Sequence, residues 1–276
     1  KPTIRITARP AEKQDLGIPG TLAPVPAASR GLGRGCAEQL AAEQCRVAIC
    51  SRDASGAKVA AGEIAEATGT EVVGFGGDVS KTEDVDRLLE NVRQTLGDPE
   101  ILVTNAGGPP PGTFATTDLK EYEKALNLNL MSAVHLIHRV VPEMKTSGWG
   151  RIIAITSISV KQPIANLLLS NMARAGLTGF LKTIATELAP FGITVNALLP
   201  GTHKTARIEQ LARDTAEREH KELAQIFEDM HEAVPCKRIG DPNDFGAAAA
   251  FLAGIQARYI TGQSLLVDGG KYGGLL

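Results

Sequence analysis

Short apolar runs alternate with longer amphipathic stretches along most of the chain. The runs have the length of strands and are rich in valine and isoleucine: CRVAIC (45–50), TEVVGF (70–75), EILVTN (100–105), RIIAIT (151–156), ITVNAL (193–198) and QSLLVD (263–268). Continuous apolar strands that alternate with helices are typical of a parallel sheet covered on both faces. Because no linker rich in proline, glycine or serine interrupts this rhythm, we predict one α/β domain over residues 18–276, with a doubly wound, mostly parallel sheet.

Helical periodicity fills the intervals between the apolar runs. It is clear at residues 81–96, and it continues through residues 118–146 and 164–190. The stretch from Pro163 to Pro190 carries leucine, methionine and phenylalanine on more than one side. A helix that is apolar around much of its girth is buried on two faces, so we expect this one to pack against the sheet and a neighbour.

Residues 203–235 interrupt the alternation of strands and helices. They have helical spacing of apolar positions, with Ile208, Leu211 and Leu223 among them, and a densely charged face. The segment follows the end of a strand, so it lies at the carboxyl edge of the sheet, where folds of this kind bind ligands. We interpret it as a helical lid or substrate loop; a plain surface hairpin or a subunit contact is the alternative.

Composition excludes several classes of function. The 276 residues carry a net charge of −2, which gives no electrostatic footprint for nucleic acid or an anionic membrane. No stretch reaches the ~20 apolar residues that span a bilayer. Residues 1–17 are polar and broken by prolines, without the apolar core of a signal peptide, so we predict a mobile N-terminal arm.

The cysteines and histidines indicate neither disulfides nor a metal site. The four cysteines have no CxxC spacing, and three of them fall within predicted buried elements: Cys36, Cys45, Cys50 and Cys236. Such residues are typical of core thiols in a reducing cytosol, so we expect a cytoplasmic protein. No cluster of histidine, cysteine and carboxylate residues has the spacing of metal ligands, so no metal is expected.

A glycine-containing turn precedes the first helical pattern, in PVPAASRGLGRGCAEQLAAE (24–43). A short strand, a turn and a helix can hold a pyrophosphate, because the N-terminus of the helix offers unpaired N–H groups and the positive end of its dipole. Glycine lets the phosphate approach the backbone, and Gly31 and Gly33 have suitable positions. By itself this signal is weak.

Further motifs in the same order give the chain a resemblance to the short-chain dehydrogenase/reductase family, over about residues 20–270. They are Gly77-Asp78-Val79, Thr104-Asn105-Ala106-Gly107, Asn129, Pro200-Gly201 with Thr205, and ITGQSLLVDGG (260–270). The resemblance implies a Rossmann-like fold and a nicotinamide dinucleotide as cofactor. The cofactor contacts that it implies here are Ser29, Arg30, Gly31, Leu32, Gly33, Arg52, Asp78, Val79, Asn105, Ala106, Gly107 and Thr205.

The turn departs from the family pattern T-G-x-x-x-G-x-G at its first two positions, which are Pro26 and Ala27. Pro24 and Pro26 both fall in what should be a central strand, where each removes a hydrogen-bond donor. Ala27 adds a methyl group where the family keeps the backbone bare. These departures bear on dinucleotide affinity, not on the fold.

The end of the second strand, ICSRD, favours NADP(H) over NAD(H). Ser51 stands where NAD-preferring members of the family carry an acid, and Arg52 follows it. Arg30 lies in the glycine turn. Because a 2′-phosphate attracts cations and is repelled by a carboxylate, NADP(H) is the expected cofactor.

The catalytic register of the family is preserved, but its residues are not. The family has a serine, a tyrosine after twelve intervening residues, and a lysine after three more; the matching positions here are Ser157, Ser170 and Arg174. The resemblance implies that Ser157 orients a carbonyl and that Asn129 supports a proton-relaying water chain. An adjacent ammonium can bring a phenol with a pKa near ~10 towards neutrality, whereas an aliphatic hydroxyl titrates far higher. Arg174 can still hold ribose hydroxyls or a substrate anion.

Three hypotheses follow. The first is an atypical NADP(H)-dependent oxidoreductase of small carbonyl or alcohol substrates, in which Ser157, Asn129 and a water or Ser170 complete the proton path. The second is a serine hydrolase, because residues 27–31 read A-x-S-x-G, the pattern of a nucleophile elbow; Ser157 and Ser170 are rival nucleophiles, and His203 is the histidine nearest the mouth. The third is a non-catalytic binding protein. The family resemblance also implies a homodimer or homotetramer.

Overall fold

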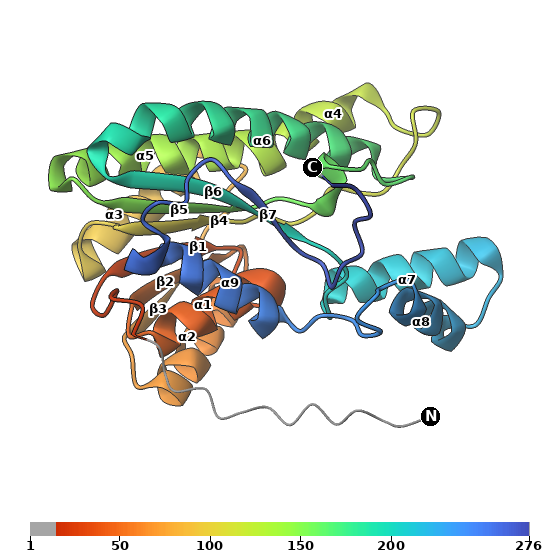
Figure 1. Cartoon of the computed structure of the whole chain (residues 1–276), viewed down its shortest axis with the longest axis horizontal. Coiled ribbons are helices and arrows are strands. Elements are labelled where there is room, and N and C mark those ends of the chain that lie inside the picture. The colour runs from red at the N-terminus through yellow and green to blue at the C-terminus, as the bar shows by residue number, and fades with distance from the viewer. Residues whose placement is uncertain (1–14, 276) are drawn as a thin grey trace.

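The computed structural model of the protein describes residues 15–275. Seven strands form the centre of this part of the chain (Figure 1): β1 (Leu22–Pro26), β2 (Arg46–Ser51), β3 (Val72–Gly76), β4 (Ile101–Thr104), β5 (Gly150–Ile155), β6 (Ile193–Pro200) and β7 (Ser264–Val267). Their order is β3-β2-β1 and then β4-β5-β6-β7, and every paired neighbour runs parallel. The predicted doubly wound α/β sheet is confirmed, and β2 to β7 lie on the six apolar runs.

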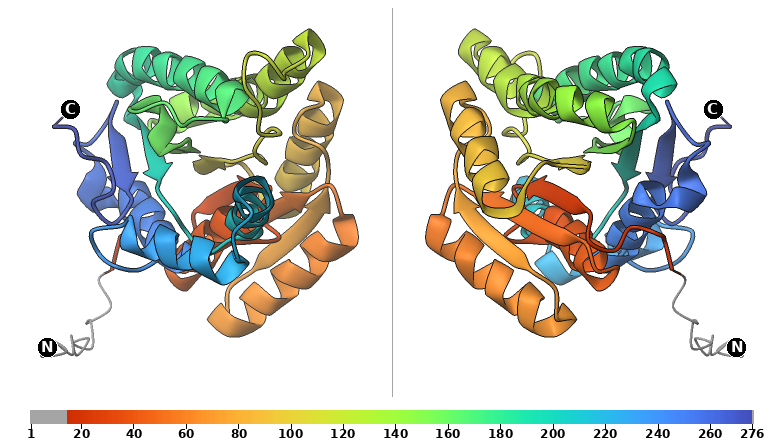
Figure 2. Two further views of the ribbon diagram at one scale, coloured as in Figure 1. Left: turned by 90° about the vertical axis from the view of Figure 1, so that its right-hand side faces the viewer. Right: turned by 90° about the vertical axis from the view of Figure 1, so that its left-hand side faces the viewer.

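Helices cover both faces of the sheet (Figure 2). They are α1 (Gly31–Ala42), α2 (Ala54–Thr68), α3 (Thr82–Leu96), α4 (Leu119–Leu126), α5 (Ser132–Ser147), α6 (Leu168–Leu188), α7 (Ala206–Glu219), α8 (Leu223–Glu232) and α9 (Pro242–Ala253). Shorter turns are η1 (Asn127–Met131), η2 (Ile158–Val160), η3 (Ala189–Phe191) and η4 (Ile255–Ala257). One apolar core joins α1, α2 and α9 to the sheet, and a second joins α3, α5 and α6 to the opposite face.

The sheet is interrupted between β1 and β4, which lie side by side without a complete ladder. The carbonyl of Leu22 accepts a hydrogen bond from the Glu100 N–H at 3.0 Å, so it faces β4. Because successive residues of a strand face opposite sides, Pro24 and Pro26 also face β4. Neither has an N–H to donate. The two prolines therefore explain why the hydrogen-bonded sheet divides at this line.

Two glycines bring α1 and α9 into backbone contact. A Cβ on Gly246 would lie 2.1 Å from the carbonyl oxygen of Gly35, and a Cβ on Gly35 would lie 2.3 Å from that of Pro242. The start of α9 is fixed by a reciprocal capping box between Asp241 and Asp244. This contact holds α1 against the body of the domain, and α1 begins at the glycine turn.

The helix expected from Pro163 begins five residues later, at Leu168. Asn166 has a left-handed backbone with φ 61°, which ends any helix upstream of it. Its carbonyl accepts from the Gly112 N–H at 2.7 Å, and the Leu168 N–H donates to the Gly112 carbonyl at 3.3 Å. The loop after β4 thus pairs with the entry to α6, and residues 163–167 form part of the rim of the sheet's carboxyl edge.

Residues 203–235 contain two helices, α7 and α8, which project from the carboxyl edge of the sheet (Figure 1). Their base is closed by backbone bonds, from the Lys204 N–H to the Gly240 carbonyl (2.8 Å) and from the Gly240 N–H to the Thr202 carbonyl (2.9 Å). The helical character predicted for the segment is confirmed, and its role as lid or subunit contact stays a prediction.

The N-terminal arm predicted for residues 1–17 falls mostly outside the described residues, which begin at Asp15. Leu16 is buried, and its carbonyl accepts from the Ile255 N–H at 2.9 Å. The Asp15 carbonyl accepts from Gln256 at 2.6 Å. Residues 15–17 therefore belong to the packed domain rather than to a mobile arm.

Candidate functional site

The glycine turn leaves the N-terminus of α1 open to a ligand. Its N-cap residue, Arg30, makes no side-chain capping bond, and the first turn contains no acidic side chain. Gly31 has φ +64°, and a Cβ on it would lie 3.5 Å from the Thr205 side chain. Unpaired N–H groups at a helix N-terminus bind anions. Thr205, at the start of α7, therefore lies beside the glycine turn, and the open N–H groups of α1 suit a phosphate group.

The backbone is strained at the position where the family pattern has its first glycine. Ala27 adopts φ 51°, in the left-handed region that alanine disfavours. Gly33 is also essential to the turn, because a Cβ on it would lie 2.6 Å from Asn105 Nδ2 and 2.7 Å from the Ala27 carbonyl oxygen. The chain thus keeps the conformation of the turn and carries strain at its first residue.

Ala27→Gly is expected to stabilise the protein by about 1 kcal/mol, because glycine adopts this backbone without the left-handed penalty. Chemical denaturation of the two proteins measures the difference. Ala28→Gly is the matched control: Ala28 is fully buried next in sequence and lacks the positive φ, so this change should destabilise the protein. Equal effects of the two substitutions would show that Ala27 is not strained.

Asn105 joins the two parts of the sheet at the same turn. Its Nδ2 donates to the carbonyl of Ala27 at 3.0 Å and to that of Pro26 at 3.4 Å. These side-chain hydrogen bonds connect β1 to the end of β4, where the prolines prevent main-chain hydrogen bonds. Ala106 packs against the core beneath α5, and Gly107 is exposed at the carboxyl edge.

The predicted adenosine side of the site lies at the ends of β2 and β3. Arg52 is exposed, and the Ser51 hydroxyl donates to the Asp53 carbonyl at 2.9 Å. The Asp53 carboxylate caps α2 by accepting from the Ser55 N–H at 3.0 Å. Asp53, the acidic residue nearest to Arg52 in the sequence, therefore uses its carboxylate to cap the N-terminus of α2.

Two further predicted cofactor residues are tied to the protein. The Asp78 carboxylate accepts from the Ser80 N–H and hydroxyl, at 3.0 and 2.8 Å, and the Asp78 N–H donates to Asp84. Val79 is buried among core side chains, so its side chain contributes to packing. Leu32 likewise packs on the core of α1, whereas Ser29 is half-buried.

Asn129 lies in a single π-helical turn, η1, between α4 and α5. Turns of this kind are rare and are frequent at functional sites. Its Nδ2 donates to the Gly107 carbonyl at 2.8 Å, while its buried Oδ1 accepts no hydrogen bond from the described residues. Since buried polar atoms are normally satisfied, this oxygen has the position and capacity to hold a water or ligand.

The three residues at the catalytic register come together through α6, which packs against both η1 and η2. Ser157 caps η2 by accepting from the Ser159 N–H at 3.0 Å. Arg174 donates through Nε to the Ser170 hydroxyl at 3.3 Å and through Nη1 to the Ile155 carbonyl at 2.9 Å. The serine and arginine that match the family's tyrosine and lysine are therefore in direct contact and buried.

Arg207, near the start of α7, lies at the same edge of the sheet and has no counterpart among the residues predicted from the sequence. Its Nη2 donates to the Pro109 carbonyl at 2.9 Å, and a Cβ on Gly108 would lie 3.2 Å from its Nε. Burial and then the positive charge of Arg207 lower the pKa of Arg174 to about 10. The only signal in the sequence was that Arg207 lies two residues after Thr205.

No hydrogen bond joins a histidine to a serine within residues 15–275. His203 is buried with its ring edge-on to Phe245 at 5.4 Å between centroids, and its Nδ1 has no partner there. Burial lowers its pKa. A serine hydrolase needs a base bonded to its nucleophile. The described geometry supplies none to Ser29, Ser157 or Ser170.

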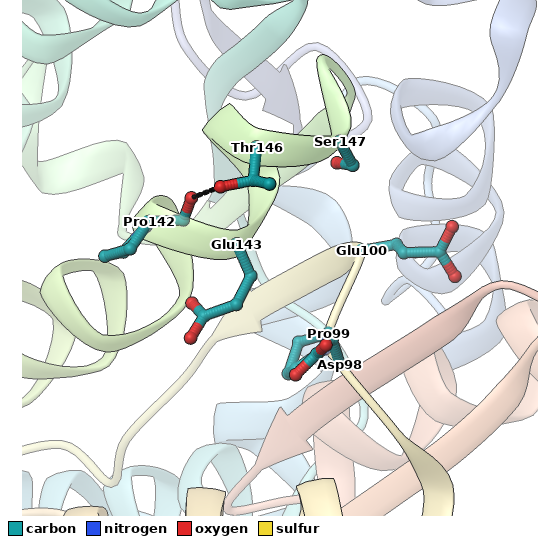
Figure 3. A pocket seen from close by; sticks show the side chains of 7 residues that line it. All are labelled: Asp98, Pro99, Glu100, Pro142, Glu143, Thr146 and Ser147. Atoms are coloured by element: carbon teal, nitrogen blue, oxygen red, sulfur yellow. Dashed lines mark hydrogen bonds between the residues drawn. The ribbon is translucent and has the colours of Figure 1, made fainter.

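Two surface hollows lie away from this edge. One, of about 340 Å³, is lined by acidic and proline residues at the amino end of β4 and the C-terminal part of α5, including Glu100, Pro142 and Glu143 (Figure 3).

Among residues 15–275 no three histidine, cysteine or acidic side chains gather as metal ligands. No described helix is long and apolar enough to cross a membrane. The predicted buried thiols are confirmed, and desolvation raises the pKa of Cys36 to about 12.

Comparison with known proteins places the chain in a family. A family model described as enoyl-(acyl carrier protein) reductase matches residues 27–271. Nodulation protein G of Azospirillum brasilense is 34% identical over 250 residues, which cover 90% of this chain and 97% of that protein. The chain belongs to the short-chain dehydrogenase/reductase family.

Other relatives in the short-chain dehydrogenase/reductase family are described as reductases. The NADPH-dependent reductase BacG of Bacillus subtilis is 30% identical, over 88% of this chain and 95% of its own length. L-sorbose reductase from Gluconobacter frateurii, solved with NADPH and L-sorbose, is similar in structure with a TM-score of 0.90 and 31% identity. The match covers 95% of this chain and all of that one. The family resemblance read from the motifs is confirmed, and the oligomeric state stays a prediction.

Proposed function

We propose that the protein is an NADP(H)-dependent oxidoreductase that acts on a small carbonyl or alcohol substrate. The observation that carries the proposal is the uncapped N-terminus of α1, which lies beside Thr205 at the glycine turn. The sorbose reductase was solved with NADPH, and BacG is described as NADPH-dependent. Both descriptions support the choice of cofactor.

The residues present suit the pyrophosphate and the 2′-phosphate of the dinucleotide. The first N–H groups of α1 would hold the pyrophosphate, and Arg52 together with Arg30 would hold the 2′-phosphate by charge-assisted hydrogen bonds. Both arginines are exposed, and neither lies within 4.0 Å of a carboxylate among the described residues. The cofactor supplies the hydride for carbonyl reduction.

The substrate carbonyl would lie between Ser157 and Ser170. Each hydroxyl accepts one bond from the protein, which leaves its own proton available to the carbonyl oxygen. The Arg174 guanidinium would favour negative charge on that oxygen through Ser170. Ser170 would give its proton to the oxygen of the carbonyl that receives the hydride, and a water held by Asn129 Oδ1 would pass a proton from solvent back to Ser170, because an aliphatic hydroxyl does not stay deprotonated near neutral pH.

Titration of the protein with NADPH and with NADH, followed by nucleotide fluorescence, tests the proposal. NADPH should bind more tightly than NADH, and Arg52→Gln should weaken NADPH binding about tenfold, or about 1.4 kcal/mol, by removing a contact to the 2′-phosphate. Lys58→Gln, on the exposed side of the following helix, is the matched control and should change neither affinity. Failure of both nucleotides to bind at millimolar concentration would favour a non-catalytic protein.

A further inference from the structure

Two arginines at the carboxyl edge of the sheet, Arg174 and Arg207, are largely withdrawn from solvent and have no carboxylate partner among the described residues. Among residues 15–275, six arginines lie within 4.0 Å of a carboxylate: Arg34, Arg87, Arg93, Arg139, Arg218 and Arg238. Arg151 is also buried without an ion pair, but it lies at the other end of β5, where it donates to the Gly150 and Gly192 carbonyls and stacks on the Trp149 ring. Arg174 is 9% exposed and Arg207 is half-buried, yet neither forms an ion pair with a described residue. Burying a charge without a counterion is costly, so this pair requires an explanation.

Both guanidinium groups are held in place with donors to spare. Arg174 uses Nε and Nη1 for Ser170 and the Ile155 carbonyl, and Arg207 uses Nη2 for the Pro109 carbonyl. A guanidinium has five N–H donors in a planar fork. The bonds described therefore orient each group and leave further donors on each for a ligand.

Burial disfavours the charge on both arginines. Burial, followed by the charge of Arg207, lowers the pKa of Arg174, and burial also lowers the pKa of Arg207. Asp214 is the acid that counters this on Arg207, but its carboxylate accepts from Gln210 at 2.8 Å within α7. With a pKa of about 10, Arg174 stays protonated at neutral pH. Arg174 donates to the carbonyl at the end of β5 and Arg207 to the loop that follows the neighbouring β4, so both cations lie at the same edge of the sheet, and neither forms an ion pair with a described residue.

Their surroundings belong to the proposed reaction site. Arg174 contacts Ser170 directly, and Arg207 contacts the loop whose Gly107 carbonyl accepts from Asn129. The Gly176 position of α6 lies 3.6 Å, measured from a built Cβ, from the Leu130 side chain beside Asn129. A ligand that reaches the two guanidinium groups is therefore next to the hydroxyl and amide groups that would handle a carbonyl.

We propose that Arg174 and Arg207 bind an oxyanionic group, a carboxylate or a phosphate, carried by the substrate close to its carbonyl or hydroxyl group. The inference rests on the proposed oxidoreductase function, since it names the class of substrate for the same site. Planar guanidinium groups match such oxyanions in geometry and charge.

Calorimetric titration with three probes, without cofactor and without turnover, tests the inference. The probes are levulinate, its neutral methyl ester and dihydroxyacetone phosphate. At least one anion should bind tenfold or more tightly than the ester, and the better anion identifies the oxyanion. Arg207→Gln should abolish the preference, and Arg207→Lys should retain part of it. Arg213→Gln, an exposed change on the same helix, should leave it unchanged.

Equal affinity for the anions and the ester would overturn the inference, and so would equal effects of the Arg207→Gln and Arg213→Gln substitutions. Circular dichroism of each variant separates lost binding from lost folding, and Arg207→Lys provides a second test if Arg207→Gln does not fold. Failure of NADPH to bind would contradict the oxidoreductase proposal even if the anion binds. Conversely, NADPH-dependent reduction of neutral ketones with no preference for anions would contradict only this inference.

Discussion

Replacing Ser170 by tyrosine and Arg174 by lysine together should raise the rate of NADPH-dependent ketone reduction by about 10²-fold, the lower end of the range for a general acid. The two positions are in contact on α6, so a lysine ammonium would lie beside the phenol and lower its pKa. A neutral ketone such as methyl levulinate should be used, because loss of Arg174 would weaken binding of an anionic substrate. The rate is measured by the loss of NADPH absorbance.

The matched control is Ser170→Phe with Arg174→Lys, which adds the same ring without an acidic hydroxyl. It should show no gain in rate. Equal rates in the tyrosine and phenylalanine proteins would contradict the assignment of position 170 as the position of the proton donor. A gain with phenylalanine would indicate that the ring acts by filling the space next to position 174, and not by donating a proton.

Gly246→Ala should destabilise the protein by about 3 kcal/mol, the upper end of the usual cost of overpacking. The added methyl group would lie 2.1 Å from the Gly35 carbonyl oxygen, which is backbone and cannot rotate away. Moving α9 outward would release α1 and the glycine turn at its start. The fall in the free energy of unfolding is measured by urea denaturation, and NADPH affinity should fall with it.

Gly62→Ala is the control for Gly246→Ala, because it makes the same chemical change in a helix with open space. Apart from the neighbouring backbone of α2 itself, no atom of residues 15–275 lies within 4 Å of the position that a Cβ on Gly62 would take. Alanine has a higher helix propensity than glycine, so this variant should gain about 0.5–1 kcal/mol. A similar loss of stability in both variants would refute the role assigned to the α1–α9 contact.

Much of the fold was predictable because a strand buried on both faces of a sheet is apolar along its whole length, and that run of apolar residues is visible in the sequence. The run RIIAIT became β5, which is buried along its whole length, and the run ITVNAL became most of β6. Asn129 and the pair Ser170 and Arg174 could be found by counting along the chain, since helices preserve spacing. Ser170 and Arg174 are in contact, and η1, which carries Asn129, packs against the same helix α6; their roles stay a prediction.

The rest depended on contacts between segments far apart in sequence. Arg207 belongs to no recognisable sequence motif. It lies at the candidate site because the loop after β4 folds so that the Pro109 carbonyl accepts from Arg207 Nη2 at 2.9 Å. The start of α6 was predicted too early because Asn166 is left-handed and its carbonyl pairs with Gly112, so the residues before Leu168 do not form a helix. The periodicity of apolar residues predicts neither the contact of Arg207 nor the late start of α6, because both depend on residues far away in the sequence.

The prolines of β1 have a mechanical consequence. Along the line between β1 and β4, sliding of one half of the sheet past the other is resisted by fewer main-chain bonds than in an unbroken sheet. Side-chain bonds bridge this line: Glu100 accepts from the Leu22 N–H, and Asn105 donates to the Ala27 carbonyl. A dinucleotide bound across the same line would contact both halves of the sheet. The cofactor would therefore hold the two halves together and contribute to the rigidity of the sheet that binds it.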